Sequence, residues 1–515
     1  MNNYLYNLGL FFSSKSSGNS SIAIRNINDI NYSFDQLEKY SNKIANYLLH
    51  KSLCRGDRIA IFNNKDYFSF ALMIAALKIG CIYSNLDENL PRERLDSMFI
   101  QINPSLVFKS DFITDSKFNS FNKLNFIDPK LDDFLKELDL FPSNLPNETY
   151  IVDSSSIAYI MFTSGSTGIP KGVAISHDSL INFINWAKDE FNISENDNLT
   201  NINQMHFDNS VFDFYASIFN NASITPINDR LLKTPLSLIK YISESNCTIW
   251  FSVPSLYVYA LKMRSFSIDQ LKTIRIFSFG GEGFPKSSLR EFAKLFFDRA
   301  EFKNVYGPTE CTCICSSYTV QPEDLSSDKL LPLGNISKNF KFLVVNESNQ
   351  LVKNGEIGEL LLGGANVGRG YFGDFKKSSK VFIQNPIHNN FCDIYYKTGD
   401  LVRFNEENGN IYFSGRADYQ IKRMGYRIEI EEIEIALNSL SYINESVVVS
   451  FINNDLNSIH AFVSSTKTDE IELLKDLRSK IPSYMIPDKI HYHEYLIKNG
   501  NGKIDRNHYR LMMES

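Results

Sequence analysis

A loop of glycines and small hydroxyl residues, entered from an apolar segment, constrains this 515-residue chain more than any other feature. Residues 157–162, Ile-Ala-Tyr-Ile-Met-Phe, predict a buried strand, and the loop then runs from Thr163 to Lys171. Glycines let the backbone approach an anion, hydroxyl and amide groups donate hydrogen bonds, and a lysine adds positive charge. The loop therefore suits a polyphosphate, although its composition alone also fits a flexible Ser/Gly turn.

The loop differs from a Walker A sequence, which places Gly-Lys-Ser/Thr at the start of a helix. Here Ile169 and Pro170 separate the last loop glycine from Lys171, and Gly172 follows the lysine. We therefore expect a phosphate-binding loop of another kind.

Length and composition exclude several classes of protein. A chain of 515 residues is too long for one hydrophobic core, so more than one domain is expected. The net charge of −6 argues against a general binder of nucleic acid or of anionic membranes. The sequence has no run long and apolar enough to span a membrane, and its first residues lack the regions of a signal peptide. We expect a cytoplasmic protein with no membrane or nucleic-acid partner.

Seven cysteines, an odd number in a long chain, do not indicate a secreted disulfide framework. Cys311, Cys313 and Cys315 alternate with other residues, and this periodicity predicts all three on one face of a strand. Their two-residue spacing does not match the Cys-x-x-Cys metal motif, so a metal or redox role is not favoured.

Helical and strand patterns alternate along the first part of the chain. Ser33-Phe-Asp-Gln fits a capping box and predicts a helix over residues 33–50. A strand over 56–62, an apolar helix over 68–77 and a charged helix after Pro91 follow. Such alternation indicates an α/β domain with much parallel sheet. Residues 111–147 are irregular in composition and predict peripheral elements.

Asp208 lies among aromatic and apolar residues of the segment 202–214. A carboxylate placed there is costly unless a cation meets it. A ligand-binding role and a helix-capping role both fit the sequence.

Two later segments combine groups suited to a nucleotide. Strands are predicted over 248–253 and 274–279, and the second opens into Gly280-Gly281, as at many ligand sites of open α/β sheets. Residues 304–310, Asn-Val-Tyr-Gly-Pro-Thr-Glu, bring together an aromatic ring, a hydroxyl and a carboxylate. This set could stack on a base, contact a phosphate and hold Mg²⁺.

These segments form an ordered set with others further along the chain: Thr163–Lys171, Tyr306–Glu310, Tyr396–Asp400, Gly415–Lys422 and Asn501–Arg506. The set resembles the motifs of the adenylate-forming superfamily. It is most similar to the amino-acid adenylation domains of nonribosomal peptide synthetases and to the D-alanyl carrier protein ligases, and the resemblance covers nearly the whole chain. It implies an α/β fold with a large multi-lobed N-terminal domain, residues 1–415, of parallel-rich sheets and helices. Residues 416–515 would form a small mobile α+β lid.

The resemblance also implies a reaction in two steps. A carboxylate attacks the α-phosphate of ATP, giving an acyl adenylate and pyrophosphate, and a thiol then takes the acyl group as a thioester. Charge accumulates on the phosphorus oxygens in the first step, and preorganised cations and donors stabilise it. The resemblance implies these nucleotide-binding residues: Thr163, Ser164, Gly165, Ser166, Thr167, Gly168, Gly280, Gly281, Tyr306, Asp400 and Arg416.

The family's catalytic residues correspond to Lys171, Thr309, Glu310 and Lys503. Glu310 would ligate Mg²⁺, and Lys503 would bridge the substrate carboxylate and the α-phosphate, although composition alone makes Lys503 an ordinary surface lysine. Asp418 would be the hinge of the lid. The segment around Gly425 would line the path of the thiol.

In amino-acid-activating members an aspartate pairs with the substrate's ammonium group, and here that position is Asp208. The remaining pocket positions are Asn209, Phe212, Leu256, Phe277, Phe279, Val305, Cys313 and Ile314. A phenyl ring at Phe279 would fill the space for a long side chain, which predicts alanine, D-alanine, glycine or serine as substrate. A flat substrate stays open because a Phe ring can change rotamer.

The nine residues after Arg506 leave no room for a carrier domain. We therefore expect an enzyme that loads a separate phosphopantetheinylated carrier protein. We also expect a monomer. The alternative is an acyl- or aryl-CoA ligase that uses free CoA, which Asp208 disfavours. A third hypothesis is a non-catalytic, carrier-binding protein. Four intact residues disfavour it: Lys171, Glu310, Asp400 and Lys503.

Overall fold

The computed structural model describes residues 5–27, 30–109, 125–165, 167–453, 456–499 and 503–514. The chain divides into two units. The first consists of Met1–Glu88, Ile102–Met161 and Gly172–Gly415, and the second of Asn89–Gln101, Phe162–Lys171 and Arg416–Ser515. The glycine-rich loop is thus grouped with the C-terminal part of the chain.

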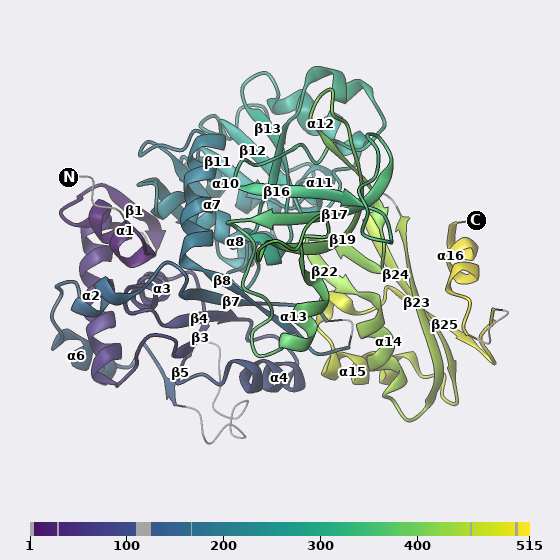
Figure 1. Ribbon diagram of the computed structural model, residues 1–515, viewed down its shortest axis with the longest axis horizontal. Coiled ribbons are helices and arrows are strands. Elements are labelled where there is room, and N and C mark those ends of the chain that lie inside the picture. The colour runs from purple at the N-terminus through teal and green to yellow at the C-terminus, as the bar shows by residue number, and fades with distance from the viewer. Residues whose placement is uncertain are drawn as a thin grey trace. The chain divides into compact units, whose positions relative to one another are not determined.

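The first unit contains a nine-stranded sheet in the order β15-β14-β13-β12-β11-β9-β10-β1-β2. Its strands are β1 (Ile22–Ile27), β2 (Ile30–Ser33), β9 (Asn198–Asn201), β10 (Ser223–Pro226), β11 (Ile249–Ser252), β12 (Ile276–Gly280), β13 (Glu301–Tyr306), β14 (Ser316–Thr319) and β15 (Asn335–Ile336). Figure 1 labels β1, β11, β12 and β13 among these strands. The strands from β13 to β1 pair in parallel, and the strands at both edges pair antiparallel. Parallel strands bring their carboxyl ends to one edge, where ligands bind in open α/β sheets.

A six-stranded sheet has the order β6-β5-β3-β4-β7-β8. It consists of β3 (Arg58–Phe62), β4 (Ile82–Leu86), β5 (Leu106–Phe108), β6 (Phe126–Ile127), β7 (Ile157–Thr163) and β8 (Lys171–Ser176). The pairs β3–β4, β3–β5, β5–β6 and β4–β7 are parallel. The parallel pairing in both sheets confirms the predicted α/β class.

A third sheet is formed by five strands from residues 340–416 of the sequence. Its strands are β16 (Phe340–Val345), β17 (Ile357–Gly364), β18 (Phe382–Gln384), β19 (Ile394–Phe404) and β20 (Ile411–Arg416). β17 pairs antiparallel with both β16 and β19, and β18 pairs antiparallel with β19. β19 contains Asp400, a candidate nucleotide-binding residue that therefore belongs to the first unit.

Two helices of the first unit lie within one or two residues of the predicted ranges 33–50 and 68–77. Ser33 caps α2 (Phe34–His50) with the capping box completed by Gln36, and α3 (Tyr67–Ile79) ends at Gly80, whose φ is 70°. The other α-helices are α1 (Leu8–Ser16), α6 (Asp132–Asp139), α7 (His177–Glu190), α8 (Asn209–Val211), α9 (Asp229–Leu232), α10 (Pro235–Glu244), α11 (Pro254–Lys262), α12 (Lys286–Phe296) and α13 (Phe375–Val381). Of the irregular stretch 111–147, residues 111–124 lie outside the described residues.

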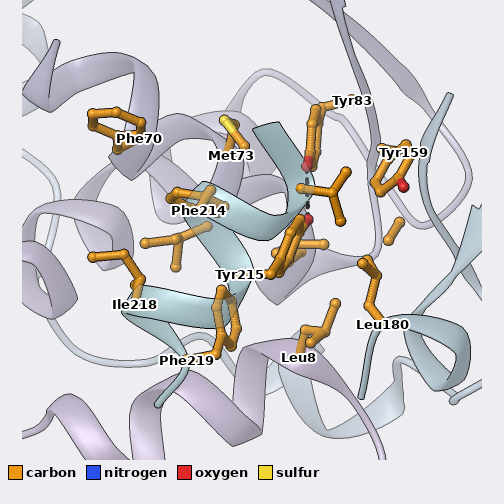
Figure 2. Packing of buried hydrophobic residues seen from close by; sticks show 14 of the residues in the cluster. Leu8, Phe70, Met73, Tyr83, Tyr159, Leu180, Phe214, Tyr215, Ile218 and Phe219 are labelled. Atoms are coloured by element: carbon orange, nitrogen blue, oxygen red, sulfur yellow. Dashed lines mark hydrogen bonds between the residues drawn. The ribbon is translucent and has the colours of Figure 1, made fainter. Parts of the chain in front are cut away.

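The core of the first unit contains two large apolar clusters. One includes Tyr83, Tyr159 and Tyr215, and Figure 2 shows the hydroxyl groups of Tyr83 and Tyr215 pointing toward one another, 2.6 Å apart. The other includes Phe277 and Phe279 from β12. The clusters differ in which face of β12 they contact, because alternate residues of a strand point to opposite faces.

The second unit contains the hairpin β21 (Gln420–Arg423) and β22 (Tyr426–Glu429) and a three-stranded sheet. That sheet consists of β23 (Ile443–Asn453), β24 (Leu456–Ser465) and β25 (Lys489–His493). Its helices are α4 (Arg92–Ile102), α14 (Ile430–Asn438), α15 (Glu470–Lys480) and α16 (Arg506–Glu514). The unit is therefore mixed α+β.

The prediction that Cys311, Cys313 and Cys315 share one face of a strand is wrong. Thr309–Cys311 is a 3-10 turn, and Thr312 and Cys313 have left-handed backbone conformations with φ of 57° and 74°. Cys311 and Cys315 pack in a different apolar cluster from Cys313. Alternation of residue types cannot reveal a turn of this kind, because the pattern assumes extended backbone.

Among the described residues, no helix combines the length and the apolar character needed to cross a membrane.

Ser33→Ala should lower the free energy of unfolding of the first unit by about 1 kcal/mol, the usual effect of losing a capping hydroxyl. The Ser33 hydroxyl accepts a hydrogen bond from the Gln36 backbone N–H at 3.1 Å. Urea unfolding followed by circular dichroism measures the effect. Ser379→Ala, at an exposed position of α13, is the control and should change stability by less than about 0.5 kcal/mol. Equal stability of the two variants would contradict this role of Ser33.

Candidate active site

The turn after β13 carries the segment Tyr306–Glu310. A Cβ atom on Gly307 would lie 2.2 Å from the Cys313 carbonyl oxygen and 2.7 Å from the Ile314 Cα, so only glycine fits. The Cys315 backbone N–H donates to the Tyr306 carbonyl at 2.8 Å. The residues after Glu310 therefore fold back onto the turn.

Tyr306 and Asp400, two nucleotide-binding candidates, lie together. The Tyr306 hydroxyl donates to Asp400 Oδ2 at 2.5 Å. Burial raises the pKa of Tyr306 well above its ordinary value, and the charge of Asp400 adds to the effect. The phenol therefore stays protonated and remains a hydrogen-bond donor at neutral pH.

Asp208 meets Thr309 across a short hydrogen bond. The Thr309 hydroxyl donates to Asp208 Oδ2 at 2.5 Å. Asp208 precedes α8, but its side chain makes no capping hydrogen bond and its own backbone is helical, with φ of −61° and ψ of −29°. The helix-capping alternative for Asp208 is therefore wrong, and the carboxylate is directed toward the turn after β13.

Glu310 is fully buried in the same turn. The Tyr371 hydroxyl donates to Glu310 Oε1 at 2.9 Å, and the Gly368 N–H donates to the Glu310 carbonyl at 2.8 Å. Sequence reasoning missed Tyr371, because nothing in the sequence relates it to a residue 61 positions away. Its hydroxyl fixes the orientation of the carboxylate.

Four of the substrate-pocket candidates pack in one apolar cluster: Phe212, Val305, Cys313 and Ile314. Burial raises the pKa of the Cys313 thiol well above its ordinary value, and the charge of Asp208 contributes. The same two causes, with the neighbouring Tyr83, raise the pKa of Tyr159. Asp208 therefore lies near this cluster, and Tyr159 is a further neighbour that the sequence did not indicate. Asn209 is the first residue of α8.

Three candidates do not join that cluster. Phe277 and Phe279 are buried in the second cluster, and Leu256 packs against it. Gly280 pairs with Val305, whereas Phe279 pairs with Asn304, so Phe279 and Val305 point to opposite faces of the sheet. The inference of a small substrate from Phe279 is wrong for this reason.

The residue of β12 that lies beside Val305 is Gly280, and Phe279 is not that residue. A Cβ atom on Gly280 would lie 2.4 Å from the Val305 carbonyl oxygen, so the close approach of the two strands requires glycine. Gly281 has a φ of 88°, which also favours glycine. Backbone geometry thus explains why both positions of the predicted ligand site, 280 and 281, are glycine.

The glycine-rich loop is described within the second unit, except for Ser166, which lies outside the described residues. A Cβ atom on Gly165 would lie 2.1 Å from the Ile169 carbonyl oxygen, and the Gly168 N–H donates to the Gly165 carbonyl at 2.8 Å. Gly168 has a φ of 78°. Both glycines are therefore needed to close the loop.

The polar side chains of the loop differ in their contacts. The Ser164 hydroxyl donates to the Arg427 carbonyl at 2.8 Å, and Lys171 Nζ lies 3.4 Å from Glu429 Oε1. The Thr163 hydroxyl is buried without a hydrogen-bond partner in the described part of the chain, and Thr167 is exposed. Thr163 thus retains a free donor.

The remaining candidates belong to the second unit. Arg416 holds Asp418 through two hydrogen bonds of 2.6 and 2.7 Å. Burial alone would raise the pKa of Asp418, but the Arg416 guanidinium outweighs it and leaves that pKa below its ordinary value. Gly425, with a φ of 80°, forms the β21–β22 turn with Met424. Lys503 is exposed, and its backbone carbonyl accepts from the Asn499 N–H at 2.7 Å.

Parallel strands that end in Gly280-Gly281 and in a Tyr-Gly-Pro-Thr-Glu turn place glycines and polar groups at the edge where open α/β sheets bind ligands. The model of the family of AMP-binding enzymes matches residues 15–372, and the chain belongs to this family. The protein is therefore an ATP-dependent, AMP-forming ligase of the adenylate-forming superfamily.

Curated relatives match over nearly their full length. The D-alanine–D-alanyl carrier protein ligase of Bacillus licheniformis is 31% identical over 484 residues, which cover 92% of this chain and 93% of that protein. The enzyme of the same name from Bacillus mycoides is 29% identical over 488 residues, covering 93% and 94%.

Solved structures confirm the predicted fold. The Vibrio cholerae adenylation domain AlmE, in complex with glycyl-adenosine-5'-phosphate, matches with a TM-score of 0.83 at 21% identity, covering 100% of this chain and 99% of that chain. The o-succinylbenzoate CoA synthetase of Bacillus subtilis, a double mutant bound with a product analogue, gives 0.82 at 19% identity, covering 98% of each chain.

Gly307→Ala should lower the free energy of unfolding by about 1–3 kcal/mol, because the new methyl group overlaps backbone atoms that cannot move independently. Thermal unfolding measures the effect. Gly283→Ala is the control, since its Cβ would meet only the Leu330 side chain, at 3.1 Å. Equal melting temperatures for the two variants would contradict the steric account of the turn.

Proposed function

We propose that the protein activates a small amino acid as an aminoacyl adenylate and transfers it to the phosphopantetheine thiol of a separate carrier protein. Asp208 carries the proposal, because its carboxylate is bound by Thr309 beside an apolar cluster. A partly buried carboxylate in such surroundings suits an ammonium ion. The names of the curated relatives, D-alanine–D-alanyl carrier protein ligases, support the amino acid and the acceptor.

The substrate is alanine, D-alanine, glycine or serine in this proposal. Support comes from the relatives and from the dense packing around Asp208, where Phe212, Val305, Cys313 and Ile314 are each at most 3% exposed. Closely packed side chains of this size favour a short substrate side chain.

In the first step the amino acid's carboxylate oxygen bonds to the α-phosphorus of ATP, and the bond between that phosphorus and the bridging oxygen of pyrophosphate breaks. In the second step the carrier thiol gives up its proton and bonds to the acyl carbon, and AMP leaves. Lys503 and Thr309 are proposed to stabilise the charge on the α-phosphate, and Lys171 that on the β- and γ-phosphates. The proposal assigns nucleotide contacts to Thr163, Ser164, Gly165, Ser166, Thr167, Gly168, Gly280, Gly281, Tyr306, Asp400 and Arg416.

Magnesium would be held by Glu310 together with the phosphates of ATP. Mg²⁺ prefers oxygen ligands and is commonly bound by one or two carboxylates plus substrate phosphates. The buried Glu310 carboxylate, oriented by Tyr371, fits this requirement. In the described residues, no group of three or more His, Cys, Asp or Glu side chains could hold a metal without a substrate.

Residues 1–415 would act as the adenylation core and residues 416–515 as a lid that turns about Asp418. This boundary is supported by the division of the chain into two units, in which Gly415 ends the last segment of the first unit and Arg416 begins the last segment of the second. The hydrogen bond between Arg416 and Asp418 would stabilise one conformation of the hinge before the lid turns. The turn at Gly425, whose Met424 side chain is exposed, would approach the thiol in the second step.

Lys503→Ala should lower the rate of substrate-dependent adenylation by about 100-fold or more, the usual effect of removing a preorganised charge from a reaction site. Pyrophosphate release measures it. Lys498→Ala is the matched control, because Lys498 is a neighbouring lysine that pairs with Glu445. A Lys503→Ala enzyme as active as the Lys498→Ala enzyme would contradict the proposed mechanism.

The acceptor is tested with radiolabelled D-alanine and ATP, offered with either a phosphopantetheinylated carrier protein or free CoA. We expect label on the carrier and none on CoA, because the relatives that share the full chain are carrier protein ligases by name. Label on CoA at a rate at least equal to that on the carrier would support an acyl-CoA ligase instead.

A further inference from the structure

Lys65 is a buried lysine with no role in the reaction as proposed. It lies in the loop between β3 and α3, is 8% exposed, and has a φ of 58°. Its ammonium donates to the carbonyl oxygens of Asn201 and Ile202 at 3.1 Å and of Ile227 at 3.0 Å. Asn201 ends β9, and Ile227 follows β10. A loop that follows β3 of the six-stranded sheet thus binds the carboxyl ends of two strands in the nine-stranded sheet.

Asp213 binds the same segment from a different element. It lies in the π-helical turn Phe212–Ala216 and is fully buried. Its carboxylate accepts from the Asn203 backbone N–H and side-chain amide at 3.1 Å, and from the Asn201 amide at 3.4 Å. The Asn203 amide also donates to the Phe251 carbonyl at 3.1 Å. Segment Asn201–Asp208 is therefore held near its start by hydrogen bonds from Lys65 and to Asp213.

This arrangement is costly. Burial lowers the pKa of Lys65, and the charges of Asp229 and Asp213 counter that shift. Burial also raises the pKa of Asp213, and the hydrogen bond from the Asn203 N–H and the charge of Lys65 counter it. A non-glycine residue at positive φ and a π-helical turn are both unfavourable, and they concentrate at functional sites. An apolar contact between the sheets would avoid the cost of burying the two ionisable groups. The network therefore secures a particular conformation of the chain.

We propose that Lys65 and Asp213 are positioning residues, which fix the segment Asn201–Asp208 and so place the Asp208 carboxylate for the ammonium group of the amino acid. This inference rests on the proposed function. Lys65 does not bind the substrate itself, because its three N–H donors match three backbone carbonyls. Asp213 acts through Asn201 and Asn203, which begin the segment that ends at Asp208.

The first test compares kinetic constants of Lys65→Met and of the nearly isosteric Asp213→Asn in the full-length enzyme, with D-alanine and ATP. Each should raise the KM for D-alanine about tenfold, which corresponds to about 1.4 kcal/mol, and leave the KM for ATP nearly unchanged. Lys78→Met is the matched control, because Lys78 is a fully buried lysine that binds Glu38. It should lower the melting temperature without changing either KM. Equal effects of Lys65→Met and Lys78→Met on the KM for D-alanine would overturn the inference.

A double-mutant cycle separates positioning from a general structural role. If Lys65 acts through Asp208, Lys65→Met should have no further effect on the KM for D-alanine in an Asp208→Ala background. Fully additive effects would overturn the positioning role and leave the proposed function intact. An unchanged KM in Asp208→Ala alone would contradict the proposed function itself. If Lys65→Met does not fold, the same cycle with Asp213→Asn decides the matter.

Discussion

The hydrogen bond from the Thr309 hydroxyl to the Asp208 carboxylate joins the two turns on which the candidate site depends. One turn follows β13 and exists because Gly307 allows the chain to pass against Cys313. The other follows β9, and Lys65 and Asp213 hold its first residues. A displacement of either turn would break the hydrogen bond. The site therefore depends on two parallel strands that end at the same edge of one sheet.

Asp208 differs in its burial from Asp213 and Glu310, two other acidic residues of the first unit. Asp213 and Glu310 are fully buried and receive hydrogen bonds from neighbouring amide or hydroxyl groups. Asp208 is only partly buried and lies beside an apolar cluster. A cation brought by a substrate would complete its surroundings, because an ammonium group stabilises a carboxylate in a medium of low dielectric constant.

The sequence predicts features that depend on local geometry. The capping box at Ser33 and Gly165 of the glycine-rich loop are examples, since each requirement involves neighbours within four residues. It fails where a one-residue difference in register decides which face a side chain occupies, as for Phe279. It also fails for contacts such as those of Lys65 and Tyr371, whose partners lie far away in the chain.

The central claim is that the Asp208 carboxylate recognises an ammonium group on the acid that is activated. Exchange of labelled pyrophosphate into ATP, measured with D-alanine and with propionate, tests it most directly, because the two acids differ only in the amine. The account predicts exchange with D-alanine alone, and a loss of that preference in Asp208→Ala. Equal exchange with propionate in the wild-type enzyme would contradict it.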